Sequence, residues 1–117
     1  MARTMREILE QHNTAVLTND YEKMIADYTD DAVLITMSGV YKGKEAIGGA
    51  LQQLMRDMPE MKPIESPTNM LTIEGDTLLL RWSAESAKGK IMNAVDTIVV
   101  KDDKIWRQTT SFEIVPK

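Results

Sequence analysis

The sequence contains no cysteine and only one histidine. The absence of cysteine excludes disulfide bonds, thiol chemistry and thiolate metal sites. One histidine with scattered carboxylates gives no recognisable metal-ligand spacing. The chain also lacks a glycine-rich phosphate loop and a nucleophile elbow. We therefore expect a protein that uses neither a metal nor a cofactor.

Positive charge is scarce as well, because 14 lysines and arginines stand against 18 acidic residues and leave a net charge of -4. Phosphate binding needs a basic stripe, and the sequence has none, so we expect no nucleic-acid partner. No apolar run is long enough to span a membrane, and residues 1–7 contain no signal-peptide core. We expect a cytoplasmic protein without a membrane partner, folded as a single domain over residues 1–117.

Hydrophobic periodicity predicts three helices in the first half of the chain. Apolar residues at helical spacing indicate an amphipathic helix over residues 3–17. A capping-box pattern formed by Asn19 and Glu22 predicts the start of a short second helix, which continues through Tyr28. The third helix is predicted over residues 44–58.

The remaining segments have the pattern of strands, whose side chains point to alternate faces with a period of two. A strand over residues 32–37 is followed by a short hairpin return. Turn residues then divide the C-terminal half into four strands, at about residues 68–74, 77–86, 90–100 and 104–115. Helices followed by a run of strands predict an α+β fold, in which a mainly antiparallel sheet packs on the helices by one face.

Asp96 is the residue that fits its predicted strand least well. Its neighbours are apolar and β-branched, so its carboxylate loses water there and needs a partner. Strand alternation places four residues on its face: Met92, Ala94, Asp96 and Ile98. His12 is likewise a polar residue on the apolar face of the first helix. A histidine and a carboxylate in a dry cavity can act as a general acid/base unit.

Three local motifs resemble the nuclear-transport-factor-two-like superfamily, which includes ketosteroid isomerase, scytalone dehydratase and the SnoaL-like polyketide cyclases. Residues 28–34 are similar to its aromatic-x-Asp-Asp-Ala-x-x junction between the second helix and the first strand. Residues 39–47 are similar to its Gly-x-x-x-Gly-x-x-x-Ile entry to the third helix, and Val95-Asp96 matches its penultimate strand. The resemblance implies a cone-shaped roll, with three N-terminal helices packed on a curved, mainly antiparallel sheet.

The resemblance also suggests functional positions. The catalytic base of ketosteroid isomerases, an aspartate, corresponds to Thr36, which cannot act as a carboxylate base. The tyrosine that donates to the steroid oxyanion corresponds to His12, and the protonated aspartate corresponds to Asp96. One of three functional residues is retained, which argues against classical steroid isomerisation.

These observations define a predicted site inside the cone. Asp96 and His12 are the candidate catalytic residues. The candidate substrate-binding residues are Tyr28, Met37, Trp82, Met92, Trp106, Gln108, Thr110 and Phe112, a mainly apolar set with a few hydrogen-bonding groups. The structural alternative is that His12 and Asp96 satisfy each other, or that Asp96 accepts from a backbone amide or a tryptophan.

Two main functions follow as hypotheses, because this fold hosts several. The first is a cofactor-independent isomerase, cyclase or dehydratase that moves a proton on a small apolar carbonyl compound. The second is a non-catalytic ligand-binding or dimerisation module, and a domain that regulates a partner protein is a third. The resemblance implies a homodimer through the outer sheet face, which would carry Arg81, Ser83, Glu85, Val95, Thr97, Val99, Arg107, Thr109 and Ser111.

Overall fold

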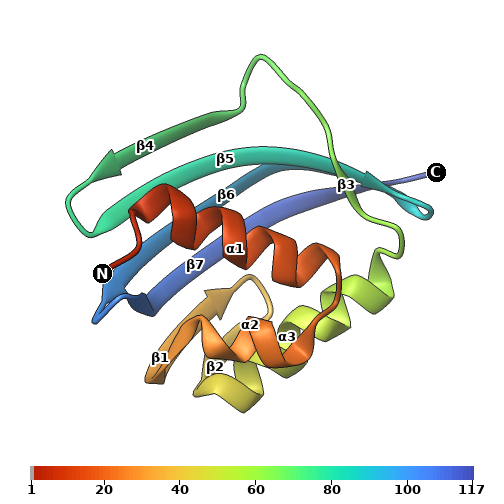
Figure 1. Ribbon diagram of the computed structural model, residues 1–117. Coiled ribbons are helices and arrows are strands. Elements are labelled where there is room, and N and C mark those ends of the chain that lie inside the picture. The colour runs from red at the N-terminus through yellow and green to blue at the C-terminus, as the bar shows by residue number, and fades with distance from the viewer. Residues whose placement is uncertain (1) are drawn as a thin grey trace.

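The computed structural model describes residues 2–117 and confirms the predicted α+β fold. Its helices are α1 (Met5–Leu17), α2 (Tyr21–Ala26) and α3 (Lys44–Asp57). Its strands are β1 (Tyr28–Thr36), β2 (Gly39–Lys42), β3 (Lys62–Pro63), β4 (Met70–Glu74), β5 (Thr77–Ser86), β6 (Gly89–Lys101) and β7 (Lys104–Pro116). All three helices lie on one side of the curved sheet (Figure 1).

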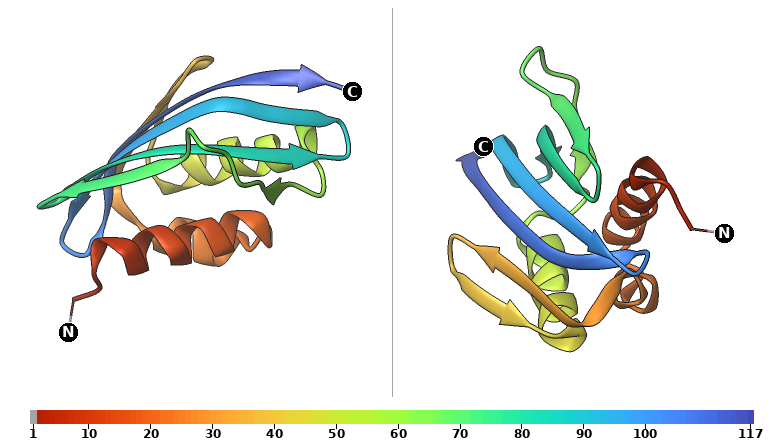
Figure 2. Two further views of the ribbon diagram at one scale, coloured as in Figure 1. Left: turned by 90° about the horizontal axis from the view of Figure 1, so that it is seen from above. Right: turned by 90° about the vertical axis from the view of Figure 1, so that its left-hand side faces the viewer.

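The sheet has the order β2-β1-β7-β6-β5-β3, and β4 also pairs with β5. Every pairing is antiparallel except the one between β1 and β7. The described strands form an open sheet that bends around the helices, as the two turned views show (Figure 2). None of the helices within residues 2–117 is long and apolar enough to cross a membrane.

A capping box starts α1. The Thr4 hydroxyl accepts from the Glu7 backbone N–H at 3.1 Å, while the Glu7 carboxylate accepts from the Thr4 N–H at 2.9 Å. This pairing satisfies two amides that would otherwise lack partners at the start of the helix. The helix buries Ile8, His12 and Ala15 against the sheet, so His12 lies on the inner face as predicted.

The structure corrects the second predicted helix at both ends. Asn19 has a φ of 52°, in the left-handed region that suits a residue just past a helix end. Asp20 therefore caps α2 instead, by accepting from the Lys23 N–H at 3.2 Å. The helix ends at Ala26, and Tyr28 opens β1 instead of extending the helix. Tyr28 is fully buried, which explains why it fitted an apolar helical stripe.

Gly48 allows α3 to pack closely on α2. A Cβ at this position would lie 2.7 Å from Cε1 of Tyr21 and 2.9 Å from Cγ2 of Ile25, closer than real Cβ atoms come. Glycine costs a helix interior about 0.5–1 kcal/mol relative to alanine. Here that cost is offset by the close contact between the two helices.

A bulge at Asn93 changes which face of β6 points inward. Met92 pairs with Glu113 and Val95 with Ser111, so the two residues of β6 between these pairs have no direct partner on β7. Asn93 itself has a φ of 53°. Ile91 on one side of the bulge and Asp96 on the other are therefore both buried. The prediction that Met92 shares a face with Asp96 is wrong, because the period of two is interrupted between them.

A second irregularity displaces Trp106. Val99 pairs with Arg107 and Val100 with Ile105, which leaves Trp106 without a direct partner on β6. Ile105 takes the inward position and is fully buried. The Trp106 ring instead lies 3.9 Å from the guanidinium carbon of Arg107, a cation-π contact.

Candidate functional site

The candidate site is a cavity of about 180 Å³ between α1, α3 and the inner face of β5, β6 and β7. Its lining is mainly apolar, with a few polar side chains. The lining residues are His12, Asn13, Val16, Leu17, Leu51, Leu54, Met61, Pro63, Leu80, Trp82, Ser83, Ala84, Asp96, Gln108 and Thr110. Asn13 and Pro63 are exposed, so the cavity reaches the surface between α1 and the segment that follows α3.

Asp96 is the one carboxylate in this lining, and two side chains donate to it. Trp82 Nε1 donates to Oδ1 at 3.1 Å, and Gln108 Nε2 donates to Oδ2 at 3.1 Å. Burial raises the pKa of Asp96, whereas the donors Trp82 and Gln108, together with the nearby hydroxyl of Thr110, lower it. The alternative in which Asp96 accepts from a tryptophan is thus confirmed. The arrangement is a hydrogen-bonded carboxyl group in an apolar wall.

Tyr28 supports this group from behind the cavity wall. Its hydroxyl donates to Oε1 of Gln108, the residue whose amide nitrogen donates to Asp96. Tyr28 is fully buried and does not belong to the lining, so the structure places it behind the cavity wall and not on the surface that a substrate would face. Burial raises the pKa of the Tyr28 phenol well above its usual value, so the hydroxyl keeps its proton.

His12 lines the same cavity from α1, but within the described part of the chain no hydrogen bond joins it to Asp96. Its ring meets Tyr28 edge-on, with 5.8 Å between the ring centres and 81° between the planes. Nδ1 is buried and has no hydrogen-bond partner among the described residues. Burial lowers the pKa of His12 to about 4, against the opposing charge of Asp27. The predicted acid/base pair is therefore not formed, and the imidazole is neutral at pH 7.

Asp27 is the carboxylate that the sequence analysis missed near His12. It lies just after α2, is 8% exposed, and accepts from Arg3 at 2.9 Å. Arg3 also donates to the Asp103 carboxylate and to its backbone carbonyl, which ties the start of α1 to the β6–β7 turn. No sequence pattern joins residues 3, 27 and 103, because only the folded topology brings them together. Within residues 2–117, no cluster of three His, Asp or Glu side chains could hold a metal ion.

The other predicted lining residues divide into three groups. Trp82, Gln108 and Thr110 line the cavity beside Asp96. Met37 and Phe112 line a second hollow of about 350 Å³, between α3, β7 and the β1–β2 hairpin, which shares Leu51, Leu54 and Thr110 with the cavity. Met92 and Trp106 line neither hollow, because the two irregularities described above turn them away. Ser83, which was predicted on the outer face, is buried and lines the cavity.

The model of the SnoaL-like domain matches residues 9–108, which is most of the chain. The chain belongs to the SnoaL-like family. The match spans α1 through the first part of β7, and so it includes His12, Asp96 and Gln108. The predicted membership of the wider superfamily is therefore confirmed. No curated protein matches this SnoaL-like domain.

Solved structures show the same fold at low sequence identity. IdmH, a proposed polyketide cyclase from Streptomyces antibioticus, has a TM-score of 0.77 at 15% identity, over 95% of this chain and 93% of its own. A proposed polyketide cyclase from Sinorhizobium meliloti has a TM-score of 0.72 at 19% identity, over 89% and 93%. An NTF2-like protein of unknown function from Cytophaga hutchinsonii has a TM-score of 0.76 at 14% identity, over 97% and 93%. These likenesses show the fold of the SnoaL-like domain.

Proposed function

We propose that this SnoaL-like domain binds a small apolar carbonyl compound in the cavity and that Asp96 exchanges a proton with it. The observation that carries the proposal is one buried carboxyl group, held by two N–H donors, in an otherwise apolar cavity wall. Such a wall with a few fixed polar groups is typical of small-molecule sites. The reaction class is a cofactor-independent isomerisation, cyclisation or dehydration, and the names of two structurally similar proteins fit the cyclase class.

The proposed step needs no co-reactant. Asp96, as a carboxylate, removes a proton from the carbon beside the carbonyl. The C–H bond breaks, its electron pair moves into an enolate, and Asp96 becomes a carboxylic acid. Return of the proton to another carbon of the same compound completes an isomerisation. Neutral His12 and the hydroxyl of Thr110 line the same cavity, and each can donate one hydrogen bond to the enolate oxygen.

The size of the cavity favours a compact ligand. An apolar protein cavity of about 150 Å³ binds a single benzene ring. The cavity of about 180 Å³ therefore suits a compound with about one ring and a carbonyl group, and the four rings of a steroid would need space beyond it, such as the second hollow that shares three of its lining residues. This argument agrees with the presence of Thr36 where a steroid isomerase has its base.

The alternative proposal is a non-catalytic ligand-binding module or a homodimer through the outer sheet face. Strand register aligns exposed Ile35 with Thr109, Thr97 and Leu79 in one row across the sheet. Ile35 is 47% exposed and Leu79 is 38% exposed, so the row mixes apolar and hydroxyl groups as moderately polar interfaces do. We expect Leu79→Lys to convert a dimer to a monomer in light scattering. A wild-type protein that is monomeric at micromolar concentration would remove the dimer.

The experiment that tests the main proposal is a thermal-shift screen of one-ring ketones, aromatic acids and larger steroids on wild type and Asp96→Asn. A ligand at a hundredfold excess over its Kd stabilises the folded state by about 2.7 kcal/mol. We expect a compact ketone to raise the wild-type melting temperature, and Asp96→Asn to lose most of that shift while remaining folded.

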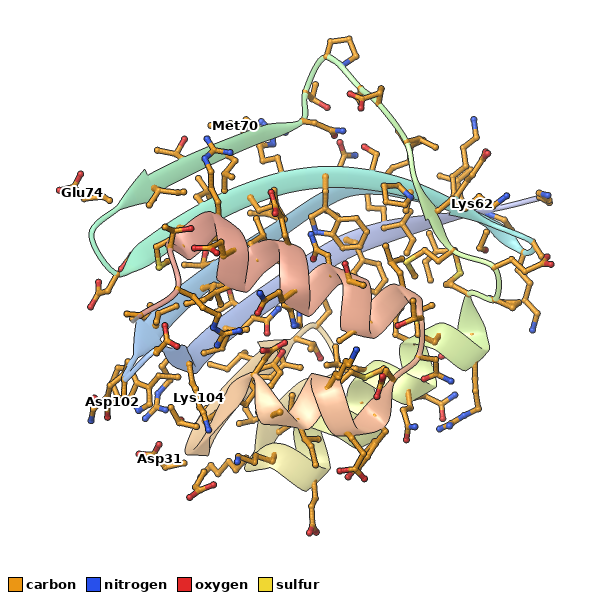
Figure 3. The ribbon with its side chains drawn as sticks, in the orientation of Figure 1. Asp31, Lys62, Met70, Glu74, Asp102 and Lys104 are labelled. Carbon is orange, nitrogen blue, oxygen red and sulfur yellow. The ribbon has the colours of Figure 1, made fainter. Side chains whose placement is uncertain are left out.

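Asp102→Asn is the matched control. Asp102 lies at the β6–β7 turn (Figure 3), is exposed, and is not among the residues that line the cavity. The same change of charge there should leave the ligand shift intact. If no compound stabilises the wild type, or if both variants lose the shift equally, the proposed role of Asp96 is wrong. A compound that passes this test is then assayed for proton exchange by NMR in deuterated water.

A further inference from the structure

A chain of side-chain hydrogen bonds runs from Tyr28 to Gln108 and on to Asp96. Its middle member, Gln108, carries a primary amide, which has an accepting oxygen at one end and a donating NH₂ group at the other. Gln108 is 3% exposed, and its two ends contact Tyr28 and Asp96. The group that faces Asp96 therefore depends on the group that faces Tyr28.

The amide has two arrangements with opposite consequences. In the first, the Tyr28 hydroxyl donates to Oε1, and Nε2 donates to a carboxylate at Asp96. In the second, the amide is reversed, so Oε1 faces Asp96 and accepts only from its protonated form. The phenol then faces an NH₂ group and its own proton loses this acceptor. Because Tyr28 is fully buried, bulk solvent does not replace the acceptor, and an unpaired buried donor is costly.

We propose that Tyr28 is a positioning residue that acts through Gln108. Its hydroxyl holds the amide so that an N–H group faces Asp96, and this orientation keeps Asp96 in the carboxylate form. Asp96 then works as a proton acceptor, unlike the protonated aspartate that the ketosteroid isomerase resemblance implies. What this inference says about the ligand rests on the proposed function. A carboxylate at Asp96 favours a compound that can give up a proton, either from a carbon beside a carbonyl or from a hydroxyl.

The other groups that face Asp96 do not make this choice. Trp82 on β5 can only donate, so it favours the carboxylate whatever Tyr28 does. The hydroxyl of Thr110 on β7 can donate in either arrangement. His12 on α1 is neutral at pH 7, because its pKa is lowered to about 4. Gln108 is thus the partner of Asp96 whose orientation is set by a neighbour outside the cavity.

The test is a titration of the Asp96 side-chain carboxyl by ¹³C NMR in the full, ligand-free chain. Tyr28→Phe removes the hydroxyl and keeps the ring that contacts His12. We expect this variant to raise the pKa of Asp96 by about one unit, which is a tenfold change in its ionisation constant. Tyr41→Phe is the control, since the Tyr41 hydroxyl contacts Ser38 in the β1–β2 hairpin and should leave Asp96 unchanged.

A double-variant cycle tests the path through the amide. With Gln108→Met in place, Tyr28→Phe should have no further effect on the pKa of Asp96. An unchanged pKa in Tyr28→Phe, or an equal shift with and without Gln108→Met, overturns the proposal. Neither measurement needs a ligand. A failure here leaves the ligand screen unaffected, and a failed screen leaves this titration intact.

A second comparison applies if Gln108→Met does not fold. In Asp96→Asn the amide oxygen accepts from Trp82, which can only donate, so the amide NH₂ faces Gln108 as the proton of the acid would. This favours the reversed Gln108, in which the Tyr28 hydroxyl has already lost its acceptor. Tyr28→Phe should therefore lower the melting temperature less in the Asp96→Asn protein than in the wild type. An equal or larger loss in the Asp96→Asn protein overturns the proposal.

Discussion

Two titratable residues line the same cavity, and they are supported very differently. Asp96 receives hydrogen bonds from Trp82 and Gln108, and Gln108 is itself held by Tyr28. His12 is buried to the same degree, but its Nδ1 has no hydrogen-bond partner among the described residues. The charge that opposes the lowering of its pKa is that of Asp27, which Arg3 already binds.

This difference shows that burial alone does not define a functional group. Both residues lose water, and both shift toward their neutral forms. Only Asp96 has donors that oppose the shift and stabilise the charged form. A carboxyl group under two opposing influences can change its protonation when a ligand arrives, whereas His12 behaves as a neutral wall group at pH 7.

The largest expected effect comes from lowering the pH, which protonates the buried His12 and destabilises the folded state. The pKa of the imidazole is about 6.5 in the unfolded chain and about 4 in the folded protein. Between pH 4 and pH 6.5, the unfolded state therefore binds more protons than the folded state. Stability due to His12 is therefore complete above pH 6.5 and is lost as the pH falls toward 4. The loss amounts to about 3 kcal/mol. Urea unfolding at pH 7 and pH 4.5 measures most of it.

His12→Leu separates this effect from the carboxylates that titrate in the same range. Leucine keeps an apolar side chain on the buried face of α1 and cannot take a proton. We expect the variant to lose clearly less stability than the wild type between pH 7 and pH 4.5. Parallel losses in the two proteins would contradict the lowered pKa of His12.

A smaller loss of stability is expected when Asp96 loses one of its hydrogen-bond donors. Asp96 then resembles His12, which is buried without such support. Trp82→Phe removes the N–H that donates to Oδ1. Hydrogen bonds to charged groups contribute about 1.5–3 kcal/mol, so we expect a loss of about 2 kcal/mol at pH 7 and a higher pKa of Asp96. Chemical denaturation gives the first quantity and carboxyl NMR the second.

Trp106→Phe provides the matched control for this change. The Trp106 indole N–H is buried but has no hydrogen-bond partner among the described residues. The same substitution there removes similar volume and at most a weak contact with the exposed Asp31 carboxylate, whose pKa the indole lowers, so it should cost less than Trp82→Phe and leave the pKa of Asp96 in place. Equal costs would mean that the Trp82 effect arises from packing.

Much of the fold could be predicted from local pattern. The predicted strand over residues 77–86 matches β5, and the strand around Asp96 differs from β6 by one residue at each end. Turns with glycine and aspartate bound both strands, and such signals act over a few residues. A tryptophan was one of several partners that the sequence left open for Asp96, and the structure selects Trp82, which lies on the adjacent strand across a short turn.

The rest depends on features that a local pattern does not contain. The bulge at Asn93 is signalled only by an asparagine, a residue that tolerates left-handed backbone, between the apolar Met92 and Ala94. Missing it put Met92 in the site. Tyr28 fits a helical stripe equally well, and its contact with Gln108 spans 80 residues across the parallel β1–β7 pair. Long-range partners of this kind are fixed by topology alone.

The interior consists of two separate apolar clusters. The larger gathers around Ile8, Tyr28 and Ile98, and the smaller around Met58, Ala84 and Ile91. The cavity is lined by members of both, including Leu51 from the larger and Met61 from the smaller. The cavity thus lies at the boundary between two packed clusters, where the side chains of one cluster do not fill the space beside the other. In a domain built this way, substitutions at the boundary can change the shape of the cavity while each cluster keeps its own packing.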